Sequence, residues 1–127
     1  MKNIFLENVP PPKGHYSPAV VHNGLIFVSG QLPMDHATGG AETGAIEKQT
    51  ELALRNVENI LLAAGSDLNH VLQFTIYVSE MDDWDKVNEV YKRILGEHKP
   101  ARAIVPVKTL HFGTQIEIQA IAAVKEQ

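Results

Sequence analysis

The chain has 127 residues, 44% of them hydrophobic, a formal net charge of −4 at pH 7 and no cysteine. This size and composition predict one globular domain, residues 1–127, with a core of its own. The lack of cysteine excludes disulfides, thiolate catalysis and cysteine-ligated zinc. The acidic balance, without any block of Lys and Arg, argues against nucleic-acid binding, which depends on neutralising phosphates.

The N-terminal segment "MKNIFLENVPPPKG" contains a short strand candidate at residues 3–7, followed by prolines that enforce an extended loop. Its apolar run is too short for a secretory signal. No apolar run in the sequence approaches the roughly 20 residues that a membrane-spanning helix needs. We therefore expect a cytoplasmic protein that does not enter a membrane.

Two β-rich runs then flank Asn23-Gly24, and this dipeptide is the strongest short signal for a β-hairpin. The second run ends at Gly30, and residues 31–44 are expected to form a polar, glycine-rich loop. Apolar residues recur at helical spacing over residues 45–64, which predicts an amphipathic helix.

A β-branched and aromatic run, "HVLQFTIYVSE", predicts the next strand over residues 70–80. Asp82 or Asp83 can cap the N-terminus of a second helix, which Gly96 closes. The inward face of this helix is expected to consist of Trp84, Val87, Tyr91, Ile94 and Leu95.

Two further strands are predicted at residues 102–109 and 115–124, and their proximity suggests a hairpin around Phe112. The order of elements is then strand, hairpin, helix, strand, helix, hairpin. A helix between strands implies a crossover, so the fold class is α+β, a mixed sheet with both helices on one face. The other face would need burial, and an oligomer provides it economically.

Most common kinds of site are not supported by the spacing of chemical groups. Ser29 lacks the GxSxG context of a nucleophile, and no glycine pattern matches a phosphate-binding loop. No pair of histidines has a metal-ligand spacing, so we expect no metal site. The six histidines are His15, His22, His36, His70, His98 and His111.

Arg102 and Glu117 stand out because each is a strong charge in an apolar strand. An arginine can hold a carboxylate through two parallel hydrogen bonds, and a glutamate can orient a water or act as a general base. From spacing alone, the more common case is that each is a strand-end charge or half of a structural salt bridge. In the predicted hairpin they lie about five residues apart, on the order of 17 Å. They are therefore either unrelated or meet across a subunit boundary.

Six segments, in order and over nearly the whole chain, resemble the RidA/YjgF family of reactive-intermediate deaminases, historically also called L-PSP endoribonucleases. They are "GHYSPAVV", "IFVSGQLP", "QTELALRNVENILLAAGSDL", "VNEVYKRIL", "KPARA" and "IEIQAIA". The resemblance implies a chorismate-mutase-like α+β fold assembled as a homotrimer. The sheets would form an inner barrel, with three ligand clefts between subunits. Family members hydrolyse enamines and imines such as 2-aminoacrylate and 2-iminopropanoate to 2-oxo acids and ammonia, with no metal or organic cofactor.

The resemblance also implies roles for particular residues. Arg102 matches the arginine that clamps the substrate carboxylate, and Glu117 matches the glutamate that orients the attacking water. Tyr16 matches a tyrosine that lines the cleft. These three are the expected catalytic residues, and the expected substrate-binding residues are Ser29, Gly30, Arg102, Ala103 and Ile104.

Two positions depart from the family pattern. His15 replaces the usual proline before Tyr16, and Ile104 stands where many members have a cysteine whose backbone N–H faces the ligand. These departures bear on the substrate more than on the fold. Hydrolysis of a small 2-imino acid is the leading hypothesis. A module that binds a small carboxylate or 2-oxo acid without turnover is the alternative, followed by cleavage of single-stranded RNA.

Overall fold

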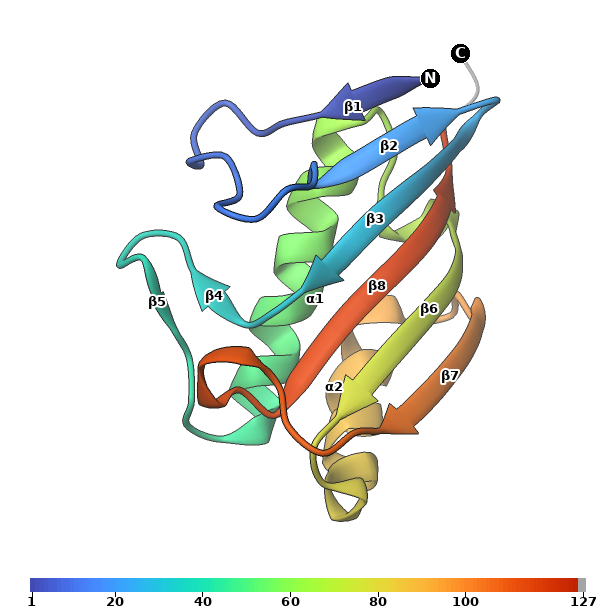
Figure 1. The fold of residues 1–127 in the computed structure, drawn as a ribbon. Helices are drawn as coiled ribbons and strands as arrows, with labels where there is room; N and C mark the ends of the chain where they lie inside the picture. The colour runs from blue at the N-terminus through green and yellow to red at the C-terminus, as the bar shows by residue number, and fades with distance from the viewer. Residues whose placement is uncertain (126–127) are drawn as a thin grey trace.

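The structure, a computed structural model, describes residues 1–125 and contains a six-stranded mixed sheet with two helices packed on one face (Figure 1). In spatial order the strands are β1 (Lys2–Ile4), β2 (Ala19–His22), β3 (Leu25–Gln31), β8 (Ile116–Ala123), β6 (Val71–Val78) and β7 (Ala101–Pro106). The helices are α1 (Ile46–Ala63) and α2 (Trp84–Leu95). The predicted α+β class, with both helices on one face, is confirmed.

The core lies between the sheet and the two helices. Phe74, Ile76 and Val78 of β6 are fully buried and alternate with the partly exposed Thr75 and Tyr77. This alternation sends every second side chain of a strand toward the helices. The residues between them face the other side of the sheet, which neither described helix covers (Figure 1).

The predicted hairpin at Asn23-Gly24 joins β2 to β3. Both residues have positive φ, 51° and 77°, as a tight two-residue turn requires. His22 pairs with Leu25 across this turn. The expected loop after β3 contains a small hairpin of its own, formed by β4 (Met34–Asp35) and β5 (Gly40–Ala41).

The predicted hairpin between the last two strands is wrong. β7 pairs in parallel with β6, and β8 lies between β3 and β6, antiparallel to both. The helix α2 is the crossover that returns the chain beside β6, and such crossovers join parallel neighbours. β7 is left at the sheet edge, where Pro106, which has no N–H to donate, is tolerated as expected. The alternating apolar residues of β8 suit a central strand.

The start of α2 also differs from expectation. Asp83 occupies the N-cap position, but its side chain makes no capping hydrogen bond. Trp84 does not face the core, because 36% of its surface is exposed. The end of α2 is as predicted, with Gly96 at a φ of 61°. Among the residues described, neither helix is long and apolar enough to cross a membrane.

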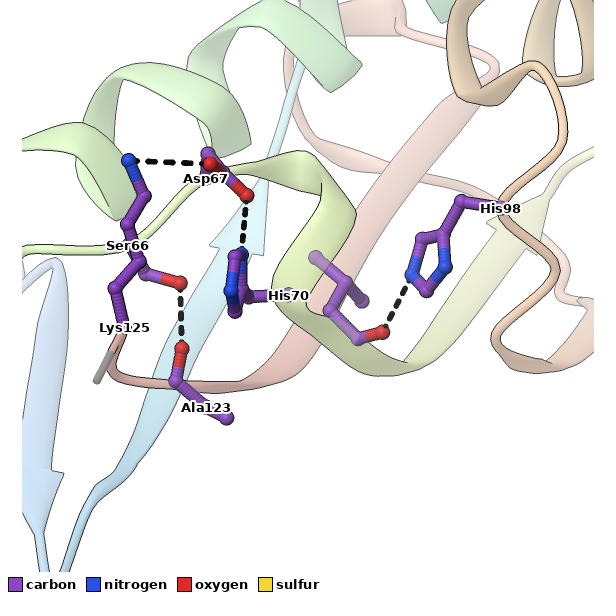
Figure 2. A network of polar contacts seen from close by, with 7 residues as sticks. Ser66, Asp67, His70, His98, Ala123 and Lys125 are labelled. Carbon is purple, nitrogen blue, oxygen red and sulfur yellow. Dashed lines mark hydrogen bonds and ion pairs between the residues drawn. The ribbon is translucent and has the colours of Figure 1, made fainter.

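Three 3-10 turns complete the chain at Leu68–His70 (η1), Met81–Asp83 (η2) and His111–Gly113 (η3). Beside η1, a polar network fixes the end of β8 (Figure 2). Asp67 contacts His70 at 2.6 Å and Lys125 at 3.1 Å, and the hydrogen bond to His70 is the main cause of its lowered pKa. Ser66 donates a hydrogen bond to the Ala123 carbonyl.

Candidate functional site

Arg102 projects from the edge strand β7 onto the helix-covered side of the sheet, beside α2. Its strand partner is Phe74, whose side chain is in the core. The Nη1 group donates a hydrogen bond of 2.9 Å to Asn88 Oδ1. The guanidinium carbon lies 4.7 Å from the ring centroid of Tyr91 and 5.5 Å from that of Trp84. These three residues share one face of α2 because they are spaced at i, i+4 and i+7.

The Arg102 guanidinium has no counter-ion among residues 1–125. It is half-buried, yet it forms none of the ion pairs found among residues 1–125. Tyr91 beneath it is uncharged, since burial raises the pKa of its hydroxyl above the usual tyrosine value, against a smaller opposite effect of Arg102. A half-buried cation surrounded by neutral groups is a site to which an anion can bind.

A surface cavity of about 560 Å³ gives access to Arg102 from solvent. It opens between the C-terminal half of α2 and the segment that leads into β7. Lys92 and Lys99 line it together with Arg102, while Glu97 is the one carboxylate among its lining residues. The surrounding charge therefore favours an anionic ligand.

Arg102, Asn88, Tyr91 and Trp84 form a first cluster, the Arg102 cluster. Glu117 and Gly30 form a second one, the Glu117 cluster, at the end of β3 and the start of β8. Glu117 pairs with Tyr77 of β6 on the helix-free face. A bulge between Val28 and Gln31 shifts the register of β3 against β8 beside it. A Cβ atom added to Gly30 within this bulge would collide with Glu117 Oε2. The carboxylate of Glu117 therefore lies directly against the backbone of Gly30, and a Cβ atom at position 30 would force that carboxylate to move.

Burial raises the pKa of the Glu117 carboxyl above the usual glutamate value, and the positive charge of His111 partly opposes this effect. Desolvation is the larger of the two causes, because half-burial disfavours the charged form. Glu117 is thus a better proton acceptor than an exposed glutamate, which suits a group that must take a proton from water.

Buried polar side chains of α1 hold this second cluster in place. Gln49 accepts a 2.8 Å hydrogen bond from the backbone N–H of Gln115, just before β8 begins. Asn56 donates to the carbonyls of Leu32 and Met34, just after β3 ends. Sequence analysis did not single out either helix residue. A polar side chain on the inward face of an amphipathic helix is the signal that could have found them.

Ser29 fixes the proline-rich loop to the sheet. Its backbone N–H donates to the carbonyl of Pro18 at 2.9 Å, and its hydroxyl donates to that of Ser17 at 2.7 Å. The neighbouring Tyr16 is 56% exposed. Ser29 therefore acts here as a structural donor, and Tyr16 lies at the surface of the loop that Ser29 holds.

The structure brings some expected site residues together and separates others. Gly30 and Glu117 touch, whereas Arg102 lies on the other face of the sheet. Arg102 pairs with Phe74 of β6 and Glu117 pairs with Tyr77 of the same strand. Phe74 and Tyr77 are three residues apart, so their side chains point to opposite sides of the sheet. Within one chain, Arg102 and Glu117 therefore form two separate clusters, and the same conclusion had followed from the incorrect hairpin.

The remaining expected residues follow Arg102 along β7. Ala103 is exposed on the helix-free face, and Ile104 is partly buried against the core. Sequence analysis had not assigned Asn88, although an asparagine at helical spacing between the two aromatic residues Trp84 and Tyr91 of α2 was a visible signal. Within residues 1–125, no group of three or more His, Asp or Glu side chains is placed to hold a metal ion.

Comparison with known proteins agrees with this architecture. The family described as Endoribonuclease L-PSP matches residues 6–124. The chain belongs to this family. A RutC family protein of Pyrococcus horikoshii is 46% identical over 119 residues, which cover 94% of each chain. The resemblance to the RidA/YjgF family is thereby confirmed.

Two further relatives of this RidA/YjgF chain have informative names. The human 2-iminobutanoate/2-iminopropanoate deaminase is 38% identical over 119 residues, 94% of this chain and 87% of the human protein. The structure of Escherichia coli TdcF with bound serine superposes with a TM-score of 0.91 at 32% identity, covering 98% of this chain and all of TdcF. Relatives that share the fold thus include a named imine deaminase and a protein that binds an amino acid.

Proposed function

We propose that this protein hydrolyses small 2-imino acids and their enamine tautomers, such as 2-iminopropanoate and 2-iminobutanoate, to 2-oxo acids and ammonia. The observation that carries the proposal is the half-buried Arg102 guanidinium, which has neutral partners and, within residues 1–125, no counter-ion. Every 2-imino acid has a carboxylate next to the electrophilic carbon. The deaminase name of the human relative supports the same substrate class.

The reaction needs positioning and one proton acceptor. Arg102 binds the substrate carboxylate and so fixes the C=N carbon, while Glu117 holds a water against that carbon. The water oxygen bonds to carbon as a proton passes to the Glu117 carboxylate. Glu117 returns this proton to the nitrogen, which gives a carbinolamine. The hydroxyl proton of the carbinolamine then passes to the nitrogen, and the C–N bond breaks as the carbonyl forms and ammonia leaves. The raised pKa of Glu117 suits this exchange.

A complete site requires a second subunit, because Arg102 and Glu117 lie on opposite faces of the sheet within one chain. We propose the homotrimer typical of the family, in which Arg102, Ala103 and Ile104 of one subunit meet Tyr16, Ser29, Gly30 and Glu117 of the next. The helix-free face would be covered in that assembly. Phe27, which is 44% exposed there, would then be buried.

The test is a trapping competition. An amino-acid oxidase generates 2-iminopropanoate in the presence of semicarbazide, and an active deaminase lowers the yield of semicarbazone. Arg102→Ala should abolish this effect. Arg93→Ala is the matched control, because Arg93 is exposed on α2 and contacts only Glu51 among the ion pairs of residues 1–125. A wild-type protein that never competes with the trap removes the proposal.

A non-catalytic binding module is the second candidate, and the separation of the two clusters favours it. The Arg102 cluster contains a cation, a hydrogen-bond acceptor and two aromatic rings without any contribution from Glu117. It could hold a 2-oxo acid by itself. Calorimetry with 2-oxobutanoate decides: binding that survives Glu117→Ala, in a protein without deaminase activity, supports this second function.

A further inference from the structure

We propose that Asn88 is a positioning residue which holds the Arg102 guanidinium while leaving its positive charge free for the ligand carboxylate. The inference rests on the proposed function, because it explains how the Arg102 site would select a substrate with a carboxylate. Asn88 does not need to touch the ligand, because it acts through Arg102.

The geometry around Arg102 constrains the guanidinium on more than one side. Asn88 Oδ1 accepts from Nη1 at 2.9 Å, and this bond fixes the rotation of the planar group. Tyr91 and Trp84 present aromatic rings to the guanidinium carbon at 4.7 and 5.5 Å. These contacts leave the remaining N–H groups for a carboxylate, which needs two parallel donors.

The chemical identity of Asn88 matters because its amide oxygen accepts a hydrogen bond without carrying charge. An aspartate has nearly the same shape and would also accept from Nη1. It would, however, be an internal counter-ion, and a ligand carboxylate would have to displace it or bind a neutralised pair. An asparagine therefore holds the arginine and preserves its attraction for an anion.

The other charged groups near Arg102 do not neutralise it. On α2, Tyr91 is uncharged and Lys92 has the same sign as Arg102. The segment before β7 contributes Lys99 and the single carboxylate Glu97, and Glu97 forms no ion pair with Arg102. The choice between asparagine and aspartate at position 88 therefore controls the net charge that a ligand meets.

The experiment compares a charged probe with a neutral probe. Calorimetry measures the affinities for 2-oxobutanoate and for its amide, 2-oxobutanamide, in the wild type and in Asn88→Asp. The wild type should prefer the carboxylate. Asn88→Asp should reduce this preference by about tenfold or more, because Arg102 is then already paired. Its melting temperature should not fall, since the new ion pair replaces the lost hydrogen bond.

Two further variants separate orientation from charge. Asn88→Ala keeps the charge of Arg102 but frees its rotation, so KM should rise on the order of tenfold with kcat changed by less than about twofold. Lys86→Gln is the matched charge control. Lys86 is exposed on α2 and the substitution changes the net charge by the same amount as Asn88→Asp, so the preference between the two probes should stay.

Three results overturn the inference: a wild type without any preference for the carboxylate, an Asn88→Asp protein that keeps the preference, or a Lys86→Gln protein that loses it equally. Failure of the deaminase proposal looks different. In that case the wild type does not compete with semicarbazide, while the probe selectivities still follow the residue at position 88. An active wild type whose Asn88→Asp form keeps full selectivity removes the inference alone.

Discussion

The Arg102 cluster (Arg102, Asn88, Tyr91 and Trp84) and the Glu117 cluster (Glu117 and Gly30) each hold one charged side chain at the sheet, but they treat its charge differently. Arg102 is held by an amide and two aromatic rings, and none of these three partners carries a negative charge that would offset its own. Glu117 is pressed against the backbone of Gly30 and partly desolvated, so its charge can be lost. The difference gives the proposed division of roles a physical basis, because the Arg102 cluster suits an anionic ligand and the Glu117 cluster suits the exchange of a proton.

The largest expected effect is on catalysis, where a variant of Glu117 should change kcat and a variant of Arg102 should change KM. Glu117→Gln keeps the size of the side chain but cannot take a proton, so kcat should fall by about 100-fold or more with KM little changed. Arg102→Met should instead raise KM by about 10- to 100-fold, because a charge-assisted pair is lost. Steady-state kinetics with enzymatically generated imine measures both. Equal changes in kcat for the two variants would contradict the division of roles.

Gly30→Ala tests whether close approach of the backbone defines the Glu117 cluster. The new methyl group would collide with the Glu117 carboxylate and force this side chain to shift, so we expect a loss of up to about 1 kcal/mol in the free energy of unfolding. Gly40→Ala is the control, because a Cβ there meets only Thr38 Oγ1 at 3.7 Å. Denaturant unfolding of both variants provides the measurement. Equal stabilities would mean that Glu117 moves away at no cost.

The pH dependence of the rate should report the ionisation of Glu117. The carboxyl must be ionised to accept a proton, and its pKa is raised, so kcat should fall with decreasing pH at values above the usual glutamate range. His111→Gln removes the charge that opposes this shift, so the fall should move to still higher pH. A kcat profile unchanged by His111→Gln would show that the two side chains are not coupled.

The same shift has a consequence for stability with a definite sign. Because the folded-state pKa of Glu117 is raised, its protonated form favours folding below the unfolded-state pKa. This contribution is lost as pH rises through the folded-state pKa. Glu117→Gln should therefore unfold at a higher temperature than the wild type near neutral pH and match it in acid. Thermal melts at several pH values check this expectation.

The smallest effect is expected at Tyr91, which serves the Arg102 cluster through its ring. The hydroxyl is buried and has no hydrogen-bond partner within residues 1–125. Tyr91→Phe should therefore be neutral or stabilising, by up to about 1 kcal/mol, while the affinity for 2-oxobutanoate stays within about twofold. A large loss of affinity would show that the hydroxyl, and not only the ring, is used by the site.

Local features of the fold were predictable because their causes are local. Asn23-Gly24 imposes its turn whatever surrounds it, and the helical spacing over residues 45–64 is a property of that segment alone. The pairing of β7 was not predictable in this way. Two strands close in sequence suggested a hairpin, but the crossover through α2 and the central position of β8 depend on the whole sheet.

The candidate site shows the same limit. Arg102 and Glu117 were visible as charges in apolar strands, and the family resemblance assigned their roles. The partners that set their properties are distant in sequence: Asn88 for Arg102, and Gly30 for Glu117. Periodicity identifies the face on which a side chain lies, but it does not identify which residue of another element meets it there.

The central position of β8 affects how the protein is made. Of the six strands of this sheet, β8 is the last in chain order, yet it joins the β1-β2-β3 meander to the β6-β7 pair. Until it emerges, these two groups of strands have no hydrogen bonds to each other within the sheet. Gly30 and Arg102 thus belong to different groups of strands while the chain is being made. Their positions relative to each other are fixed only when β8, which ends at Ala123, has paired with both groups. A ribosome-bound chain stalled before residue 116 should be readily proteolysed between these units.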